Sequence, residues 1–470
     1  MRALRRVILE NCTTMLGLAS VIVVTLAAIG FLALFVLEMT GAKLSPYLGI
    51  LTYMVLPGAF LAGLAGVAFA RFRRRRAARA GHPLHVLDLS NPRDRERLLG
   101  FGLLTVVNCA ILGLAGYHGV HYMDSTAFCG KVCHTVMEPE YTAYQHSPHA
   151  RISCTDCHIG PGADWFVKAK ISGVRQVLAV ATHSYETPIP TPVQALRPAR
   201  ETCEQCHWPS KFLGDRIKVL SRYEQDEKNT ELKTVLLLKV GGGSLESGFG
   251  TGIHWHVTSA IDYRSSPDRK RIDWIKVQNP DGSTREYWSD GAKARKDSTL
   301  LEPVRRMDCI DCHNRPTHRY ELPSDALDNA LKSGRIASDL PFFKREAMTL
   351  LRADWPTKQM ALEAFDDSLH AFYRGNYPEI AANRAADVDS AVAAMSGIYA
   401  RNIFPKMKIG WGTYPTMIGH RDEGGCFRCH DEQHSSEDGK TVSQDCTTCH
   451  NLLAMEEQNP PILQSLYGSP

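Results

Sequence analysis

Residues 154–158 have the sequence CTDCH, and this five-residue pattern decides the fold. The same C-x-x-C-H pattern returns at residues 203–207, 309–313, 426–430 and 446–450. From the chain's own Cys and His frequencies, roughly 0.02 such patterns are expected by chance. Two thiols at this spacing add to the two vinyl groups of a haem, and the adjacent imidazole reaches the iron as its proximal ligand. The sequence therefore predicts a protein with several covalently attached haems.

A longer version of the pattern stands at residues 129–134, where three residues instead of two separate the cysteines. With this variant, the motifs use twelve of the fourteen cysteines. We therefore predict six c-type haems. The predicted attachment residues are Cys129, Cys133, Cys154, Cys157, Cys203, Cys206, Cys309, Cys312, Cys426, Cys429, Cys446 and Cys449, and the predicted proximal ligands are His134, His158, His207, His313, His430 and His450.

Two other uses of paired cysteines fit the pattern less well. A disulfide scaffold outside the cell gives no reason for a histidine directly after the second cysteine of every motif. A zinc site needs two C-x-x-C elements that fold over one metal, but these motifs lie tens to more than a hundred residues apart, except for the last two. Both alternatives are therefore disfavoured.

Each iron of a low-spin electron carrier needs a second axial ligand, and the chain has nineteen histidines to draw on. His254 and His256 flank Trp255 in a run that is typical of a strand, where residues two apart share one face. We expect both imidazoles to point the same way and one of them to bind iron. His183 and His254 are weaker candidates, and the pairing of ligands with haems stays open. The distal ligands that we favour are His149, His256, His318, His420 and His434.

Three uncharged stretches predict membrane-spanning helices. They cover residues 13–37, 47–70 and 98–117, and the first reaches roughly 37 Å as a helix, more than the roughly 30 Å of the hydrocarbon core. Apolar runs of buried helices in soluble proteins are usually shorter. No small-residue cleavage site closes the first helix, so we expect it to remain as an anchor.

Arginines set the expected orientation. They precede the first helix and crowd residues 71–97, whereas the loop between the first two helices holds only Lys43. Cytoplasmic loops of membrane proteins carry the excess of basic residues. We therefore expect a multi-pass protein of the cytoplasmic (inner) membrane, with everything after about residue 120 in the periplasm.

The remaining sequence predicts two regions without haem motifs. Alternating residues from about 215 to 300 predict strands, and helical spacing from about 323 to 400 predicts a haem-free helical segment. A net charge of only +4 over 470 residues predicts no nucleic-acid partner. The expected fold class is a three-helix transmembrane anchor plus a multihaem c-type cytochrome domain, mainly α and irregular with a small β insert. The expected regions are 1–120 (anchor with a basic cytoplasmic loop), 121–214 (first haem region), 215–300 (β-rich insert) and 301–470 (C-terminal haem region with the helical segment).

Three stretches around the first two motifs follow one another in a specific order: CHTVM at 133–137, YQHSPH at 144–149 and CTDCHIGPG at 154–162. This order resembles the NapC/NirT family of membrane-anchored multihaem quinol dehydrogenases, over roughly residues 98–210. Further along, CIDCHNRP and GCFRCHD resemble the longer inner-membrane relatives of metal-reducing bacteria.

The resemblance implies roles for individual residues. Met137 corresponds to the ligand of the first iron, His149 to a distal ligand and Lys170 to a residue that lines the quinol pocket. His118 or His121 would help Lys170 to position the quinone oxygen or accept a proton. The family's first motif is C-x-x-C-H-x-M, whereas both gaps are one residue longer here. Its small members have one anchor helix, and the additional helices predicted here would shape a quinone pocket or bind a partner.

The resemblance also implies a function. The chain would act as a quinol dehydrogenase that oxidises menaquinol or ubiquinol from the membrane pool and passes electrons to periplasmic cytochromes or reductases in anaerobic respiration. Its lipid contact is the bilayer around the anchor. Two alternatives stay open. One is a terminal multihaem reductase of nitrite, hydroxylamine or a sulfur oxyanion, and the other is an electron-transfer subunit of a larger respiratory complex.

Overall fold

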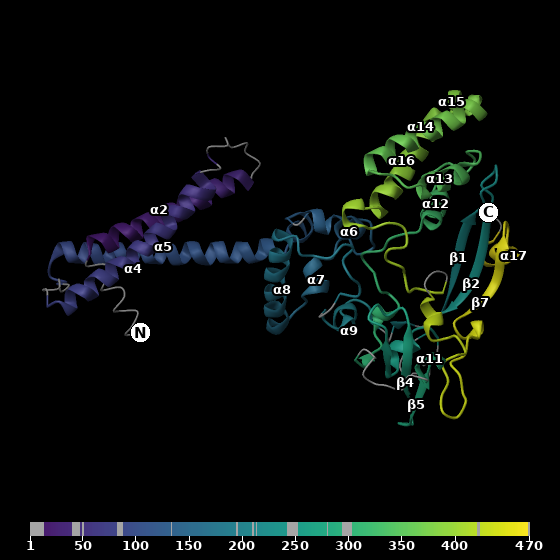
Figure 1. The fold of residues 1–470 in the computed structure, drawn as a ribbon, viewed down its shortest axis with the longest axis horizontal. Helices are drawn as coiled ribbons and strands as arrows, with labels where there is room; N and C mark the ends of the chain where they lie inside the picture. Colours follow the sequence, from purple (N-terminus) through teal and green to yellow (C-terminus); the bar gives the residue numbers. More distant parts are fainter. Residues whose placement is uncertain are drawn as a thin grey trace. The chain divides into compact units, whose positions relative to one another are not determined.

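The computed structural model divides the chain into two compact units, Met1–Met123 and Asp124–Pro470 (Figure 1). The structure describes residues 14–39, 48, 51–81, 88–132, 134–193, 196–208, 211–212, 214–241, 252–279, 281–293, 303–420 and 424–468.

The N-terminal unit is built from long apolar helices. Within its described part, two segments are long and apolar enough to cross a membrane, Met15–Leu34 and Pro92–Met123. The apolar part of the third long helix, α4, ends at Ala70 because a run of arginines starts at Arg71. Of the expected three-helix anchor, two helices are thus supported and the third is not confirmed. The helical bounds are α2 Met15–Met39, η1 (a π-helical turn) Leu51–Val55, α4 Leu56–Arg79 and α5 Pro92–Met123.

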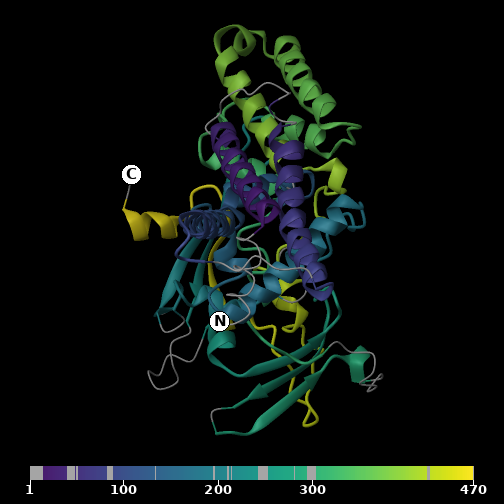
Figure 2. The same ribbon diagram turned by 90° about the vertical axis from the view of Figure 1, so that its left-hand side faces the viewer.

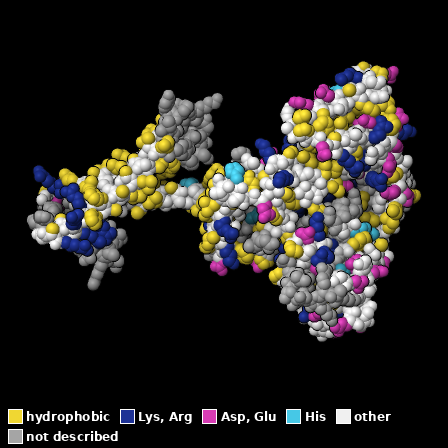
Figure 3. Space-filling view, viewed as in Figure 1, with side chains coloured by type: hydrophobic (Ala, Val, Ile, Leu, Met, Phe, Trp, Pro, Cys, Tyr) yellow, Lys and Arg dark blue, Asp and Glu magenta, His cyan; other side chains and the backbone are white. Residues whose placement is uncertain are grey.

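Small residues and one polar contact join these helices. An added Cβ at Gly63 would collide with Val24 of α2, so the absence of a side chain lets α4 approach α2 closely. Asn108 of α5 donates a 2.7 Å hydrogen bond to the hydroxyl of Thr25. Apolar side chains cover the helices of this unit, and Lys and Arg side chains gather at one end of it (Figure 3). This distribution suits a bundle with lipid around its middle.

Strands of the C-terminal unit form two antiparallel sheets, in the orders β1-β2-β7 and β5-β4-β3-β6. Residues 215–300 supply five of these strands, but β7 and β6 come from the chain that follows. The expected β insert is therefore not self-contained: the free edge of β2 pairs with the C-terminal β7, which satisfies its backbone groups. The strand bounds are β1 Asp215–Tyr223, β2 Glu231–Lys239, β3 Ile261–Ser265, β4 Ile272–Gln278, β5 Thr284–Trp288, β6 Arg305–Arg306 and β7 His450–Glu457.

The helical segment holds the largest apolar core. Leu327, Phe365 and Leu369 are fully buried in it, because apolar residues recur at helical spacing on the inner faces. Pro323 occupies the first turn of α12, and Thr357 caps α14 by accepting from the amide of Met360. In Figure 2 this segment lies at one end of the C-terminal unit and strands β3 to β5 at the other. The bounds are α12 Pro323–Lys332, α13 Phe343–Arg352, α14 Lys358–Asn376, α15 Pro378–Asn383 and α16 Ala385–Asn402.

Short helices connect these parts and carry most of the cysteine motifs. Only α6 and α8 among them exceed seven residues. Their bounds are η2 Phe128–Val132, α6 His134–Gln145, α7 Cys154–His158, α8 Ala163–Ala181, α9 Ala199–Cys203, α10 Trp255–Thr258, α11 Asp290–Lys293, η6 Cys309–Asp311, η7 Pro405–Met407, η8 Gly425–Arg428, η9 Cys446–Thr448 and α17 Pro461–Tyr467.

Candidate haem sites

We number the cysteine motifs 1 to 6 in chain order. Motifs 2 to 6 fold as single helical turns. In motif 4, the amide of His313 donates to the carbonyl oxygen of Cys309 at 2.8 Å, and motifs 3 and 5 have the corresponding bond at 2.8 and 3.1 Å. Residues three and four apart lie on one face of such a turn. Both cysteines and the histidine of a motif therefore face the same side, as attachment of one haem requires.

Capping side chains fix where these turns begin. Asp308 accepts from the amide of Cys309, and Asp311 accepts from the amide of Asp308 at 2.7 Å, so the two carboxylates form a reciprocal cap around motif 4. Ser153 and Asp156 form the same kind of cap at motif 2. Such caps satisfy amides that a one-turn helix leaves unpaired, and they hold the motif without a long helix around it.

Five motif histidines each lie against a second histidine that belongs to no motif. The ring centres in these pairs are 5.8 to 6.5 Å apart. The pairs are His158 with His318 (6.1 Å), His207 with His149 (6.1 Å), His313 with His254 (6.5 Å), His430 with His256 (5.8 Å) and His450 with His420 (6.1 Å).

This spacing matches what one iron between two imidazoles requires. An imidazole nitrogen binds a first-row metal at about 2 Å and lies about 1 Å from the centre of its own ring, so the centres of two axial rings lie about 6 Å apart. The cysteines of each motif stand beside the pair. The residues therefore fit c-type haem with two axial histidines.

Hydrogen bonds at the other ring nitrogen orient several of these imidazoles. The Nδ1 atoms of His254, His256, His318 and His430 face the backbone oxygens of Val240, Ile253, Glu140 and Ser443 at 2.7 to 3.0 Å. A ring that donates through Nδ1 presents Nε2 to a metal, which is the usual arrangement of ligand histidines.

Burial favours the neutral form that a ligand needs. Desolvation is the largest cause that lowers the pKa of His158, His256, His313 and His318. A neutral imidazole keeps a lone pair for the metal. The Nδ1 atoms of His149 and His450 are buried without a hydrogen-bond partner among the described residues. Each of these two rings therefore has a nitrogen inside its site that is not used by a protein hydrogen bond.

Four of the five favoured distal histidines lie opposite a motif histidine, and one does not. His434 is 1% exposed, and its two ring nitrogens contact Asp431 at 2.9 Å and the backbone oxygen of Ile272 at 3.0 Å. No ring nitrogen of His434 is left to bind iron. His254, a weaker candidate from the sequence, faces the motif histidine His313.

The expected strand around Trp255 is wrong. Residues Trp255–Thr258 form the short helix α10, with His254 at its N-cap. The two flanking histidines therefore point to different motifs, and both of them, rather than one, face a motif histidine. Gly252 has a φ of +91°, and its missing side chain avoids the backbone of Lys239 and Gly241, which turns the chain before α10.

Motif 1 is only partly visible. Cys133 and the side chain of His134 lie outside the described residues. Met137 lies one turn further along α6 and is half-buried. The thiols of Cys129 and Cys154 hydrogen-bond each other, so motif 1 is a direct neighbour of motif 2.

The other motifs also neighbour one another in chain order. Helix α7 of motif 2 contacts α9 of motif 3, and the thiol of Cys203 hydrogen-bonds that of Cys309 in motif 4. His420, which faces His450 of motif 6, also stacks on Phe427 of motif 5 with ring centres 4.4 Å apart.

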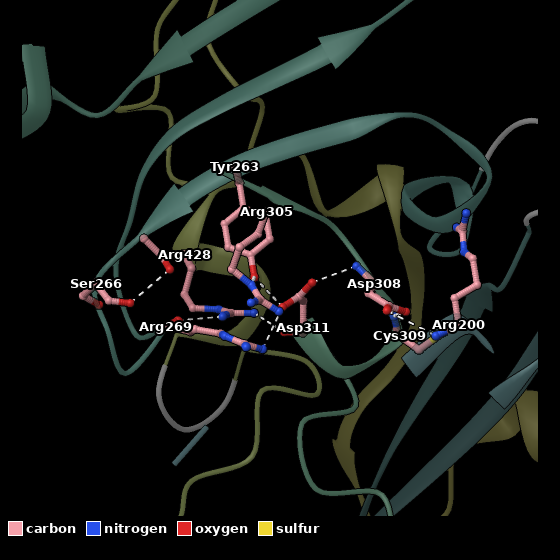
Figure 4. A network of polar contacts seen from close by, with 10 residues as sticks. Arg200, Tyr263, Ser266, Arg269, Arg305, Asp308, Cys309, Asp311 and Arg428 are labelled. Atoms are coloured by element: carbon pink, nitrogen blue, oxygen red, sulfur yellow. Dashed lines mark hydrogen bonds and ion pairs between the residues drawn. The ribbon is translucent and has the colours of Figure 1, made fainter. Parts of the chain in front are cut away.

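A polar network centred on Asp311 joins motifs 3, 4 and 5 (Figure 4). Its carboxylate accepts from the hydroxyl of Tyr263 at 2.5 Å and faces Arg269 at 3.4 Å, while its backbone oxygen accepts from Arg428 of motif 5. On the other side, the amide of Arg200, just before motif 3, donates to Asp308 at 3.2 Å. Asp311 is 4% exposed, so the centre of this network is shielded from water, and its bonds connect the three motifs.

Lys170 forms a 2.8 Å ion pair with Asp124, and about a third of each side chain is exposed. The backbone oxygen of Asp124 accepts from the hydroxyls of Ser153 and Thr155 at motif 2. The charges of Asp124 and Lys170 both act on Cys129. A solvent-accessible acid and base thus stand beside motifs 1 and 2. Sequence reasoning found Lys170 and missed Asp124, whose only signal is that it follows the long apolar helix.

The attachment motifs and paired imidazoles define a membrane-anchored c-type cytochrome. Residues 93–191 match the model of the NapC/NirT cytochrome c family, N-terminal region. The chain is 42% identical to the cytochrome c-type protein ImcH of Geobacter sulfurreducens over 460 residues, 96% of this chain and 90% of that relative. It is 29% identical to the cytochrome c-type protein NrfH of Wolinella succinogenes over 122 residues, 24% of this chain and 68% of that relative. No solved structure matches significantly.

The chain belongs to the NapC/NirT cytochrome c family, as the order of residues around the first two motifs predicted. The finer expectations, on haem number, quinol and partners, are taken up below.

Proposed function

We propose that this protein is a six-haem cytochrome of the inner membrane that oxidises menaquinol or ubiquinol and delivers the electrons to periplasmic cytochromes or reductases. The observation that carries the proposal is the set of five imidazole pairs. Residues that would hold an iron from both sides leave no place for a substrate, so motifs 2 to 6 suit electron transfer. The terminal-reductase alternative then depends on motif 1 alone, whose second ligand the described residues do not show.

The residues that would hold the haems follow from the geometry. When bound, the haems would accept and pass on single electrons. Motifs 2 to 6 would each use their two cysteines for attachment and their histidine with its facing partner as axial ligands. At motif 1, Cys129 and Cys133 would attach the haem, and His134 and Met137 are the ligand candidates.

The neighbouring order of the motifs supports a directed path. Motif 1 contacts motif 2 through Cys129 and Cys154, and each later motif contacts the next. Successive attachment sites are thereby neighbours from motif 1 to motif 6. Asp311 and its partners connect motifs 3, 4 and 5 in the middle of this series.

The ion pair of Lys170 and Asp124 would form the quinol site. The ammonium of Lys170 can donate to a quinone oxygen, and the carboxylate of Asp124 can accept a proton from the quinol hydroxyl. About a third of each of these two side chains is exposed to solvent, so a released proton can pass to water. His118 and His121 lie in the last turns of α5 and remain secondary candidates.

The proposed anchor has three helices, of which α4 is the third. Helix η1 extends α4 toward its N-terminus with uncharged residues, and the arginines of α4 and α5 would lie on the cytoplasmic side. The C-terminal unit, which follows α5, would then lie in the periplasm.

Two variants test the quinol site in the full chain reconstituted in lipid nanodiscs. We expect Asp124→Asn to slow haem reduction by a menaquinol analogue about 10²-fold, the usual contribution of a positioned base. Lys170→Met should raise the quinol concentration needed for half-maximal rate. The matched control is Lys228→Met, an exposed lysine in the turn between β1 and β2, which should behave as the wild type.

Reduction by dithionite must stay complete in all three variants, which shows that the haems are intact. Unchanged rates in both Asp124→Asn and Lys170→Met would remove this site from the proposal.

A further inference from the structure

Helix α8 presents an apolar stripe to its surroundings. Val167, Ile171, Val174 and Leu178 follow the spacing of one helix face and are 54 to 62% exposed. In Figure 1, α8 runs along the border of the C-terminal unit, with α7 and α9 on its inner side. With more than half of each side chain exposed, the stripe is not packed against the rest of the C-terminal unit.

Basic side chains flank this stripe on both sides. At 100° per residue, Lys168 and Arg175 lie on one side of it and Lys170 on the other. Trp165 stands beside Lys168, whose ammonium lies 4.6 Å from the centre of its ring. An apolar stripe between basic residues is typical of helices that lie in a membrane interface.

Chain connectivity places this helix at the membrane. Helix α5 is long and apolar enough to cross a membrane and ends at Met123, and Asp124 is the next residue. The uncharged part of α5 ends at Tyr117, so Asp124 lies about two helical turns beyond the hydrocarbon core, in the interfacial region. Its 2.8 Å ion pair with Lys170 holds the middle of α8 at the same level.

We propose that α8 lies in the plane of the membrane surface at the exit of α5. Val167, Ile171, Val174 and Leu178 dip among the upper acyl chains, and Lys168 and Arg175 bind anionic headgroups. The occupant of the stripe is thus the lipid bilayer, and not a second copy of the chain or another subunit. This inference does not rest on quinol oxidation.

Photo-crosslinking of the haem-loaded full chain tests it. Motif cysteines that carry haem are thioethers and do not react with maleimides, so a background of Cys12→Ser and Cys109→Ser leaves an introduced cysteine as the reactive thiol. A benzophenone is attached at Val174→Cys. The matched control is Gln176→Cys, which is exposed on the opposite face of the same helix. Both proteins are illuminated in nanodiscs of phosphatidylcholine with phosphatidylglycerol.

We expect lipid adducts from position 174 and none above background from position 176. Haem spectra identical to the wild type show that both variants are folded. A protein adduct from position 174, whether with a second copy or another chain, would overturn the proposal. So would equal lipid yields at the two positions. Quinol-driven haem reduction is a separate readout, so loss of the quinol site would leave the crosslinking result unchanged.

Discussion

His256 and His434 lie near the same motif, and the structure gives them different roles. The ring of His256 lies 5.8 Å from that of His430, whereas both nitrogens of His434 contact protein oxygens. Replacing His256 with alanine would remove one of the proposed axial ligands, and alanine has no atom that could replace it. We therefore expect one haem of the proposed six to become high-spin in His256→Ala.

His434→Ala should have a different consequence. The change removes two hydrogen bonds from a side chain that is 1% exposed, and it leaves Asp431 and the oxygen of Ile272 without these partners. Unpaired buried groups cost about 1–3 kcal/mol each. We expect the free energy of unfolding to fall by about that amount, while every haem keeps its axial ligands.

Electron paramagnetic resonance of the oxidised proteins separates the two outcomes. The high-spin ferric signal, divided by total haem, should rise to about one sixth in His256→Ala and stay at the wild-type level in His434→Ala. Chemical denaturation measures the stability change. A new high-spin signal in His434→Ala, with none in His256→Ala, would refute the assignment.

Two further variants test the scaffold. Asp311→Ala leaves Arg269 buried without its ion partner. We expect the free energy of unfolding, measured with a denaturant, to fall by about 3–5 kcal/mol, and the spectrum of the motif 4 haem to change. An unchanged stability would contradict the role of the network. Phe365→Ala leaves a cavity in the helical segment and should cost about 3–5 kcal/mol while the haem spectra of the folded protein stay unchanged, so a shifted spectrum would show that this core reaches the haem sites.

The sequence is enough to predict candidate attachment sites because their chemistry is local. A c-type haem needs two cysteines and a histidine within one helical turn. Each of motifs 2 to 6 has all three residues within five consecutive positions. Family membership followed from the same local order. The two long apolar helices that the structure supports were predicted from charge-free length alone.

Distal ligands depend on contacts that are remote in sequence. His318 faces His158 across 160 residues of chain, and only the folded path through α6 and Glu140 brings them together. His434 stands four residues after His430 and looked suitable for that reason, but Asp431 and Ile272 occupy its nitrogens. The alternating pattern around Trp255 predicts that His254 and His256 share one face of a strand, whereas the helix that starts after Gly252 turns them toward different motifs.

Sheet partners were missed for a similar reason. Alternation correctly indicated strands in 215–300, but alternation does not say which strand covers an open edge. The pairing of β2 with β7 places His450, the last motif histidine, at the start of a strand. Asp124 belongs to no recognisable sequence motif. Only its ion pair with Lys170 in the structure identifies it as a candidate site residue.

The most direct test of quinol oxidation is the optical spectrum of the oxidised wild-type protein in nanodiscs while a menaquinol analogue is added, with and without a quinone-site inhibitor. We predict that quinol reduces the haems and that the inhibitor blocks this reduction. Complete reduction by dithionite together with no reduction by quinol would contradict the account.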